Sequence, residues 1–528
     1  MRLLARRLIP LTFAIGVLAP AAAGPTLTAA AANPIVTENQ ETGTTAWQIG
    51  AQPANDTIGQ IKGYASATSV SQNQSIKFYV SVYPPQTYSI DFYRIGWYGG
   101  LGGRLRLNVP ALLGTTQAPC VPNVSTGLTD CGWEPSYTLT VPPDWTSGVY
   151  LGLLTNSRGY QNYVIFVVKD GRPAQYLYQS SVATYQAYND YPNNGLTGKS
   201  LYPFNSYGVA VGRSDTRAYK VSFDRPYSGD GAGQFFWWEI QFVRWAERLG
   251  YDLTYTTDID THENGRALLN SKAFLSVGHD EYWSAQMFNA AEAARDAGVN
   301  LAFLGSNEVF WQVRFEPSSS GVPDRVMVCY KDASLDPVQG PTTTVNFRSA
   351  PVNRPEQTLV GIQYTSSGNW GQNVGYVVQN SSNWAYAGSG VNDGDSIPGM
   401  VGYEMDRLWS NYPGPATSNQ TLLSRSPYVS TEGVSDYANS SIYQAPSGAW
   451  VFAAGTTVWN LGLDSFNSTL ADPRIQQTMA NIMNAFTSGA PAAPATVAAA
   501  PPVLAPGAGA SPSMAAELTS SQLQLTGD

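Results

Sequence analysis

The sequence predicts a mixed α/β protein in which an antiparallel β-sandwich is followed by a doubly wound parallel sheet. Between residues 273 and 311, an apolar run, an amphipathic helix and a second apolar run follow one another, which is the pattern of a βαβ unit. Before residue 170, apolar and polar residues alternate instead, and Pro- and Gly-rich turns separate the alternating runs. That second pattern is typical of antiparallel strands, so we expect two different architectures in one chain.

The βαβ unit organises the predicted second domain. Its two apolar runs, residues 273–277 and 300–304, are each followed by a glycine, and Ser284 stands where the N-cap of the intervening helix is expected. Parallel strands joined by a crossover helix end at the same edge of a sheet, and open α/β sheets bind ligands outside that edge. We therefore expect residues 278–281 (Gly-His-Asp-Glu) and 305–308 (Gly-Ser-Asn-Glu) to project into one cleft.

Residues 1–32 have the pattern of an export signal. The basic stretch MRLLARR precedes the apolar LIPLTFAIGVLAPAAA and a run of small residues, with cleavage expected between Ala23 and Asn33. The Arg6-Arg7 pair leaves Sec and twin-arginine export as open alternatives. No other stretch approaches the roughly 18 apolar residues that span a bilayer, so we expect a secreted or cell-envelope protein without a membrane span.

Length and charge narrow the classes of function. At 528 residues the chain is longer than a usual single domain, which predicts two domains. Its net charge of -9 repels phosphate backbones, and the sequence contains no cluster of Lys and Arg that could bind them locally. We therefore exclude nucleic acid as a partner.

The three cysteines predict one disulfide in an exported protein. Cys120 and Cys131 are close in the sequence and flank a turn-rich segment, so we expect them to be bridged. Cys329 lies in an apolar run, where a buried thiol is the expected state and a nucleophile is the less favoured alternative.

Residues 33–169 form the predicted β-sandwich, of immunoglobulin or fibronectin type. Alternating or β-branched runs mark four expected strands, at residues 76–82, 90–93, 137–141 and 164–168. The motif Tyr-Arg-Ile-Gly-Trp-Tyr-Gly-Gly at residues 93–100 has two interpretations. It is either an aromatic platform for a polymer or partner domain, or a packed hairpin whose glycines adopt positive φ, and we favour the hairpin.

Residues 170–487 form the predicted α/β domain, in which strands and helices alternate. Expected strands lie at residues 175–178, 251–255, 273–277, 300–304 and 450–454. Expected helices lie at residues 235–250 and 475–486, and a third, behind the N-cap Ser284, includes Met287 to Ala294. The remaining segment, residues 488–528, is rich in Ala and Pro and too poor in large apolar residues to offset the entropy of ordering. We expect it to be a flexible spacer.

Several polar side chains at the expected strand ends could support catalysis. His279 and Glu281 share one loop, but the chain has no His-x-x-x-His or Cys-x-x-Cys pair to complete a zinc site. It also has no Gly-x-Ser-x-Gly motif between a strand and a helix, which argues against a serine hydrolase. Carboxylate, tyrosine and amide oxygens remain, and such hard donors suit a hard Lewis acid such as ferric iron. The alternative is that Tyr188 and Tyr202 are ordinary hydrogen-bonded residues among 31 tyrosines.

Eight motifs occur along the second domain in this order: TYQAYN, GKSLY, VSFDRPY, LTYTTDIDTHENG, SVGHDEYWS, GVNLAFLGSNEVFWQVRFEPS, VCYK and GYEMDR. In these motifs the chain, from about residue 175 to 485, resembles the catalytic region of the large (beta) subunit of N,N-dimethylformamidase and its relatives. The resemblance implies a class I glutamine-amidotransferase-like α/β fold and a mononuclear ferric iron held by two tyrosines and one glutamate. The formamidase is cytoplasmic and works with a separate small subunit, whereas this chain has an export signal and its own N-terminal sandwich.

The resemblance also assigns residues to this centre. Glu281, in GHDEYW, matches the carboxylate ligand. Tyr188, in TYQAYN, and Tyr202, in GKSLY, match the two phenolates, with Tyr185 as the competitor of Tyr188. Four more residues are implied to surround the metal: His279, Asn307, Lys331 and Glu404.

The predicted function is that of a secreted, iron-dependent hydrolase that cleaves the carbon-nitrogen bond of a small amide. Glu404 is the expected general base or nucleophile, His279 transfers protons and Asn307 holds the oxyanion, with Lys331 beside them. The alternative is a non-catalytic surface or glycan-binding protein that keeps the fold. Formation of a homo-oligomer and association with the cell surface stay open.

Overall fold

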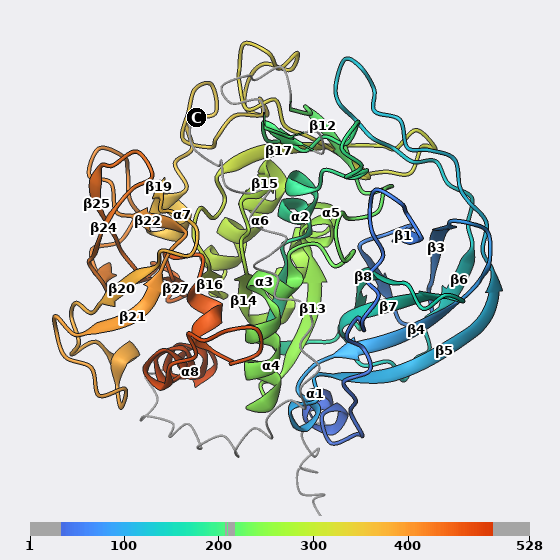
Figure 1. The fold of residues 1–528 in the computed structure, drawn as a ribbon. Helices are drawn as coiled ribbons and strands as arrows, with labels where there is room; N and C mark the ends of the chain where they lie inside the picture. The colour runs from blue at the N-terminus through green and yellow to red at the C-terminus, as the bar shows by residue number, and fades with distance from the viewer. Residues whose placement is uncertain (1–32, 206–207, 210–216, 489–528) are drawn as a thin grey trace, which may run out of the picture.

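The computed structural model describes residues 33–205, 208–209 and 217–488, and its architecture is mixed α/β with several sheets (Figure 1). The blue and cyan strands of the N-terminal part lie beside a central sheet that is accompanied by helices. The export signal predicted for residues 1–32 lies outside the described residues. The spacer predicted for residues 488–528 does so too, except for Ser488, which ends the last helix.

The N-terminal part consists of two sheets that share one apolar core. The three-stranded sheet has the order β1 (Ile61–Ala65), β3 (Ser75–Val82) and β6 (Tyr137–Thr140). The five-stranded sheet has the order β2 (Ser69–Ser71), β8 (Gln161–Lys169), β7 (Gly148–Asn156), β4 (Thr87–Ile95) and β5 (Gly103–Leu113). Phe78 of the first sheet contacts Phe92 and Phe166 of the second, at centroid distances of 5.1 and 5.5 Å. The four predicted strands are confirmed, while the immunoglobulin or fibronectin type stays a prediction.

The second part is built around a seven-stranded sheet. Its order is β13 (Leu253–Thr257), β9 (Ala174–Ser180), β14 (Ser271–Val277), β16 (Asn300–Leu304), β27 (Trp450–Ala453), β26 (Ser441–Gln444) and β23 (Thr421–Leu422). The first five strands are parallel, and β26 and β23 extend the sheet in antiparallel pairs. The predicted βαβ unit is confirmed as β14, α6 (Ala285–Asp296) and β16, with Ser284 as the N-cap of the helix.

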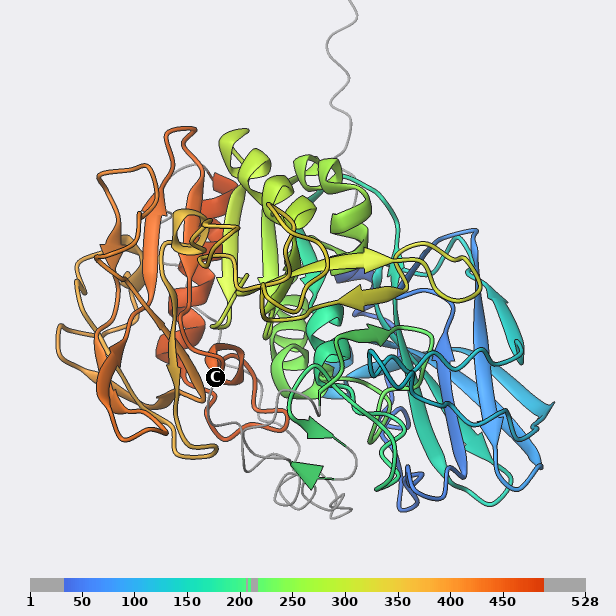
Figure 2. The same cartoon turned by 90° about the horizontal axis from the view of Figure 1, so that it is seen from above.

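Helices cover both faces of this sheet (Figure 2). On one face, α4 (Ile240–Arg248) and α8 (Pro473–Ser488) share an apolar core with Leu275 and Val277 of β14. On the other face, α6 shares a core with Phe274 and Leu301. Because the second half of β14 is buried on both faces, residues 273–277 are mostly apolar and do not alternate with exposed polar residues. Assignment of this sheet to the class I glutamine-amidotransferase-like fold stays a prediction.

The order of the parallel strands decides which loops of the chain meet. Numbered along the chain, the five strands occupy the order 2-1-3-4-5, because β13 lies outside β9 and the later strands extend the sheet beyond β14. The sheet therefore changes its direction of growth between β9 and β14, and such a switch point leaves a crevice at the carboxyl ends of the two strands. The segments that follow Ser180 and Val277 come together there.

Smaller elements surround the central layers. A four-stranded sheet has the order β12 (Lys220–Ser222), β18 (Val326–Val328), β17 (Trp311–Glu316) and β15 (Tyr282–Ser284). Two-stranded sheets pair β10 (Phe204–Asn205) with β11 (Gly208–Val209), β19 (Gln363–Ser367) with β22 (Glu404–Arg407), β20 (Val374–Val377) with β21 (Ser396–Val401), and β24 (Ser426–Val429) with β25 (Ser435–Ala438). The short helices are α1 (Pro34–Glu38), α2 (Val182–Tyr188), α3 (Phe235–Trp238), α5 (Asp258–Glu263) and α7 (Gln357–Val360). Of the helices in the described ranges, none has the length and apolar character needed to cross a membrane.

The single helix predicted for residues 235–250 is in fact two helices, α3 and α4. They are separated at Glu239, whose φ of -120° departs from helical values. The buried carboxylate of Glu239 accepts hydrogen bonds from donors at the end of β9 and in α2. These tertiary hydrogen bonds hold Glu239 out of the helix, and the helical period of the sequence contains no sign of them.

A buried ion pair joins the two parts of the chain. Arg94 of β4 donates to both carboxylate oxygens of Glu247 in α4, at 2.6 and 2.9 Å, and neither side chain is exposed to solvent. The Tyr255 hydroxyl donates to the same carboxylate at 2.6 Å. Gly96 lies so close that a Cβ atom there would come within 2.3 Å of Glu247 Oε2. The motif at residues 93–100 is thus packed between the two parts and is not an exposed platform.

The disulfide between Cys120 and Cys131 is present, and Cys329 is free and buried, as predicted. The bridge shares a small apolar core with Tyr64 of β1 and with Tyr191, which lies just after α2. A loop of the N-terminal part is therefore packed directly against the second part.

Replacement of Glu247 by glutamine should lower the free energy of unfolding by about 3 to 5 kcal/mol, because it leaves the charge of Arg94 buried and uncompensated. Urea unfolding measures the change. Glu316→Gln is the control, since Glu316 pairs with Lys220 while its side chain is 41% exposed, and a change within about 1 kcal/mol is expected there. Equal effects of the two substitutions would contradict a stabilising role of the buried pair.

Loss of the disulfide should also destabilise the protein. Its two cysteines are separated by 11 positions, and closure of so short a loop contributes about 3 kcal/mol in the chain-entropy description. Urea unfolding of the Cys120→Ser, Cys131→Ser double variant tests this value. Cys329 should react with a thiol reagent only after unfolding, and rapid labelling of the native protein at Cys329 would contradict its burial.

Candidate functional site

The candidate site lies at the switch point between β9 and β14. Helix α2 follows β9 and ends at Tyr188, and the connection after it leads to Tyr202. His279 and Glu281 lie in the turn between β14 and β15. The other predicted residues come from later segments: Asn307 after β16, Lys331 after β18, and Glu404 at the start of β22. The fold therefore brings together all seven residues that the resemblance singled out.

Three oxygen-bearing side chains meet at the centre of this site. The Tyr202 hydroxyl lies 2.9 Å from Oε1 and 2.7 Å from Oε2 of Glu281. The Tyr188 hydroxyl lies 3.2 Å from Oε2 of the same carboxylate, and the centroids of the two phenol rings are 4.4 Å apart. The Glu281 N–H donates to Thr184 Oγ1 at 3.0 Å, so the turn after β14 is tied directly to α2.

Tyr185, the competitor of Tyr188, points elsewhere. Its hydroxyl lies 3.2 Å from Ser180 Oγ and donates to the carboxylate of Glu239 between α3 and α4. The structure thus brings Tyr188 to Glu281 and leaves Tyr185 in a separate buried network.

His279 connects Glu281 with Glu404. Its Nε2 lies 3.4 Å from Glu281 Oε2 and 3.2 Å from Glu404 Oε2, while Nδ1 lies 3.2 Å from the Ser306 carbonyl oxygen. Burial disfavours the imidazolium, but the two carboxylates outweigh burial and raise the pKa of His279 to about 9. The ring is therefore a cation at neutral pH, and both nitrogens donate hydrogen bonds.

Glu404 is paired with an asparagine whose backbone is held in an unusual conformation. Burial and the charge of Glu281 raise the pKa of Glu404 to about 7, against the opposing effect of His279. Asn307 Nδ2 donates to Glu404 Oε2 at 3.1 Å. Asn307 has a φ of 55°, and its N–H donates to Asp406 Oδ1 at 2.7 Å. Within the described ranges, Asn307 Oδ1 is buried and has no hydrogen-bond partner, so the amide can still accept a bond from a ligand.

Lys331 brings a second positive charge to the site. Its Nζ lies 3.5 Å from the centroid of the Tyr202 ring and 4.8 Å from that of Trp311. Removal of the ammonium from water lowers the pKa of Lys331 to about 8, which leaves it mostly protonated at neutral pH. Burial would raise the pKa of Glu281, but His279 and Lys331 outweigh burial and lower it, so Glu281 is ionised.

The oxygen atoms gathered around Glu281 could hold a cation. Oxygen ligands about 2 Å from one small cation lie roughly 2.8 to 3.3 Å apart. The phenol and carboxylate oxygens here are separated by 2.7 to 3.2 Å. Burial and Glu281 raise the pKa of Tyr188 and Tyr202 well above the usual value, whereas a cation between the oxygens would stabilise the phenolates. In the part of the chain that the structure describes, no three His, Cys, Asp or Glu side chains form a metal site, so this donor set depends on the phenols.

The prediction that residues 278–281 and 305–308 project into one cleft is correct only in part. Asp280 and Glu308 turn away and meet at Ser276, whose Oγ lies 2.7 Å from Asp280 Oδ2 and 3.2 Å from Glu308 Oε2. Burial raises the pKa of both carboxyl groups, which favours their neutral forms. Alternation along residues 278–281 places Asp280 on the side opposite to His279 and Glu281. Residues 305–308 form a bend with a φ of 55° at Asn307, and this bend directs Glu308 toward Ser276.

Sequence patterns missed two further tyrosines. The Tyr403 hydroxyl is within hydrogen-bonding reach of Tyr188, and its ring meets that of Trp370 edge-on at 4.9 Å. Tyr364 of β19 lies close enough for the charge of Glu404 to act on its phenol. Tyr403 directly precedes Glu404, a position that strand alternation would assign to the opposite side, and no motif surrounds Tyr364. Tyr403 lies within the motif GYEMDR, but the motif drew attention to Glu404 alone, and Tyr364 carries no local signal.

Comparison with known families extends the resemblance toward the N-terminus. A family model described as N,N-dimethylformamidase beta subunit-like, C-terminal, matches residues 89–474, and no curated protein matches the chain with statistical significance. The match begins in β4, before Arg94, so the strand that forms the buried ion pair belongs to the family region. The match also includes the whole candidate site. Because it covers more than half of the 528 residues, this chain belongs to the N,N-dimethylformamidase beta subunit-like family.

Proposed function

We propose that this protein is an iron-dependent amidohydrolase whose metal is held by Tyr188, Tyr202 and Glu281. One observation supports the proposal above all others. Two phenol oxygens lie 2.7 to 3.2 Å from one buried carboxylate, beside the protonated ring of His279 and the carboxyl group of Glu404. Family membership supports a dimethylformamidase-like hydrolase.

Ferric iron suits this donor set because two phenolates and one carboxylate are hard, anionic oxygen ligands. When bound there, the metal supplies Lewis acidity that polarises an amide carbonyl. The net charge of the donors, three negative charges when both phenols are ionised, would also match a trivalent cation.

The surrounding residues provide proton transfer and orientation. With a pKa of about 7, Glu404 can take a proton at neutral pH from the water that attacks the carbonyl carbon. The protonated His279, 3.2 Å from Glu404, can deliver a proton to the amine as the carbon-nitrogen bond breaks. Asn307 Nδ2 can donate a hydrogen bond to the carbonyl oxygen as negative charge develops on it, with Lys331 nearby. The products are a carboxylic acid and an amine.

The proposed substrate is a small amide, and we place the reaction outside the cytoplasm. The export-signal pattern of residues 1–32 supports this location. The disulfide supports it as well, because disulfides persist in oxidising compartments.

The alternative is a non-catalytic surface or glycan-binding protein. One observation favours it: Trp370 is 41% exposed and packs against Tyr403 and Trp238, so its ring could stack on a sugar. The metal content of the protein separates the two functions.

The purified, aerobically handled protein should contain about one iron per chain and be coloured, because phenolate bound to ferric iron absorbs visible light by charge transfer. Metal analysis and absorption spectroscopy measure the two properties. A colourless protein that binds zinc or calcium would contradict the phenolate site. A protein that binds no metal would favour the glycan-binding alternative.

Variants of the donor set should alter iron and colour in different ways. Glu281→Ala should lose most of the iron, since the remaining neutral groups cannot balance its charge. Tyr202→Phe and Tyr188→Phe should each shift or bleach the band, because each removes one phenolate. Tyr185→Phe is the matched control in the same helix and should leave the band unchanged. A band that responds to Tyr185→Phe and not to Tyr188→Phe would reverse the assignment.

Glu404→Gln should lower the turnover of a small amide by about 10²- to 10⁴-fold and leave iron and colour in place. The substitution removes a proton acceptor that lies outside the proposed set of ligands. Glu432→Gln, at an exposed glutamate, is the control and should keep full turnover. Loss of iron from Glu404→Gln would show that Glu404 is itself a ligand.

A further inference from the structure

Arg225 is a buried cation between the two segments that carry the candidate tyrosine ligands. It is 1% exposed, and its Nη2 donates to the Asn189 carbonyl at 2.7 Å. Its Nη1 donates to the carbonyls of Tyr191 and Lys199 at 3.0 and 3.1 Å. Its Nε donates to Gln186 Oε1 at 3.3 Å. One planar guanidinium thus binds one acceptor in α2 and three carbonyls of the connection that follows it, residues 189–201, which we call the tyrosine loop.

These acceptors flank both candidate ligands. Asn189 directly follows Tyr188, and Lys199 precedes Tyr202 by three residues. Because Nη1 and Nη2 belong to one rigid fork, the guanidinium ties the end of α2 to the segment that leads to Tyr202. The distance between the end of α2 and the segment that leads to Tyr202 helps to determine how far apart the two phenol oxygens lie.

The charge of Arg225 depends on this loop for its hydrogen bonds. Burial lowers the pKa of Arg225 to about 10, against the opposing effect of Asp190, so the guanidinium stays protonated at neutral pH. A buried charge is tolerated only when its hydrogen-bonding groups are satisfied, and here the carbonyls of the tyrosine loop satisfy them. A shift of the loop would leave the charge without partners, so the loop is held in place.

The backbone next to Arg225 is fixed by the disulfide loop of the N-terminal part. The Cys131 N–H donates to the Asp224 carbonyl at 2.8 Å, and the Tyr219 N–H donates to the Thr126 carbonyl at 2.7 Å. Arg225 therefore extends from a braced segment toward a loop that has little regular structure of its own.

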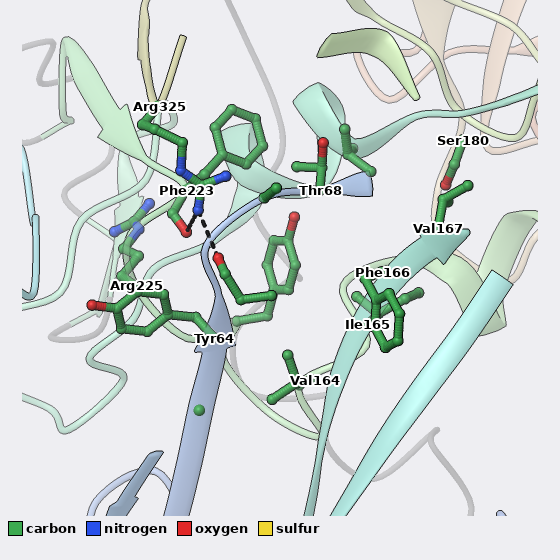
Figure 3. Close-up of a pocket in the computed structure, with 16 residues that line it drawn as sticks. Tyr64, Thr68, Val164, Ile165, Phe166, Val167, Ser180, Phe223, Arg225 and Arg325 are labelled. Carbon is green, nitrogen blue, oxygen red and sulfur yellow. Dashed lines mark hydrogen bonds between the residues drawn. The ribbon is translucent and has the colours of Figure 1, made fainter. Parts of the chain in front are cut away.

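Arg225 also lines a small cavity between the two parts of the chain, together with Arg325 (Figure 3). The cavity has a volume of about 30 Å³, enough for about one water molecule and too small for an amide substrate. Arg325 is 5% exposed and donates to the carbonyls of Ala65 and Phe223 at 2.8 and 2.9 Å, as the dashed lines show. It matches Arg225 in type, burial and location, but its acceptors lie outside the tyrosine loop.

We propose that Arg225 is a positioning residue that sets the separation of the Tyr188 and Tyr202 oxygens around Glu281. The inference rests on the metal site of the proposed function. Arg225 would contact neither metal nor substrate and would act through the carbonyls of the loop. Lysine cannot replace it, because one ammonium group cannot reach four acceptors that match a planar fork.

Arg225→Lys and Arg225→Gln test the proposal, with Arg325→Lys as the matched control. In the Arg225 variants we expect iron affinity to fall roughly 10- to 100-fold and the visible band to shift, as for other residues that orient metal ligands. Arg325→Lys should lower the thermal midpoint of unfolding by about as much as Arg225→Lys does. Its iron affinity and its visible band should stay at wild-type values. Wild-type iron affinity and band in both Arg225 variants would overturn the proposal, and so would an equal loss of affinity in Arg325→Lys.

Crystal structures of the metal-free proteins separate a failure of this inference from a failure of the proposed function. In the metal-free wild type the phenol oxygens should lie 2.7 to 3.2 Å from the carboxylate oxygens of Glu281, whether or not the protein can bind iron. In Arg225→Lys at least one of these separations should increase beyond hydrogen-bonding distance, while Arg325→Lys should retain them. A wild type that binds no iron would refute the metal site alone, whereas unchanged separations in Arg225→Lys would refute the positioning role.

Discussion

The parallel pairing of β9 with β14 is the constraint on which the candidate site depends. Ser180 stands opposite Val277 in the register, so α2 and the turn that carries His279 and Glu281 leave the sheet side by side. Because β13 lies on the outer side of β9, the strands β9 and β14 are direct neighbours and the sheet grows away from this point in both directions. A slip of one residue would reverse the faces of every side chain in the moved strand and separate Tyr188 from Glu281. Apolar burial of β14 on both faces opposes such a slip.

The N-terminal part is structurally continuous with the candidate site. The Arg94–Glu247 pair is desolvated on both sides, and a charge removed from water in this way tolerates little relative movement of the two parts. The disulfide loop makes a second contact, through Cys131 and the backbone beside Arg225. That the family region begins within β4 agrees with this continuity. The N-terminal part therefore packs against the segment whose Arg225 holds the connection between Tyr188 and Tyr202.

Charge balance distinguishes this site from the buried carboxyl groups behind it. Around Glu281, the positive charges of His279 and Lys331 keep one carboxylate ionised although it is buried. Around Ser276, the carboxyl groups of Asp280 and Glu308 lie together, and burial shifts both toward the neutral acid. The pKa values of two adjacent residues are thus shifted in opposite directions, that of Asp280 upward and that of Glu281 downward, because neighbouring side chains of the turn face different surroundings. Only the ionised group can offer negative charge to a metal.

The sequence by itself predicted the main strands and helices and named the residues of the candidate site. The apolar run at residues 273–277, the N-cap at Ser284 and the disulfide followed from local patterns, since periodicity, capping and cysteine spacing act over short distances. Motifs named Tyr188, Tyr202 and Glu281, but left Tyr185 as a competitor. Tertiary structure alone brought Tyr188 to Glu281 and Tyr185 to Glu239, broke the helix at Glu239 and joined Arg94 to α4. Each depends on partners more than 50 residues away in the chain, and no local period or motif records which distant group will accept a hydrogen bond.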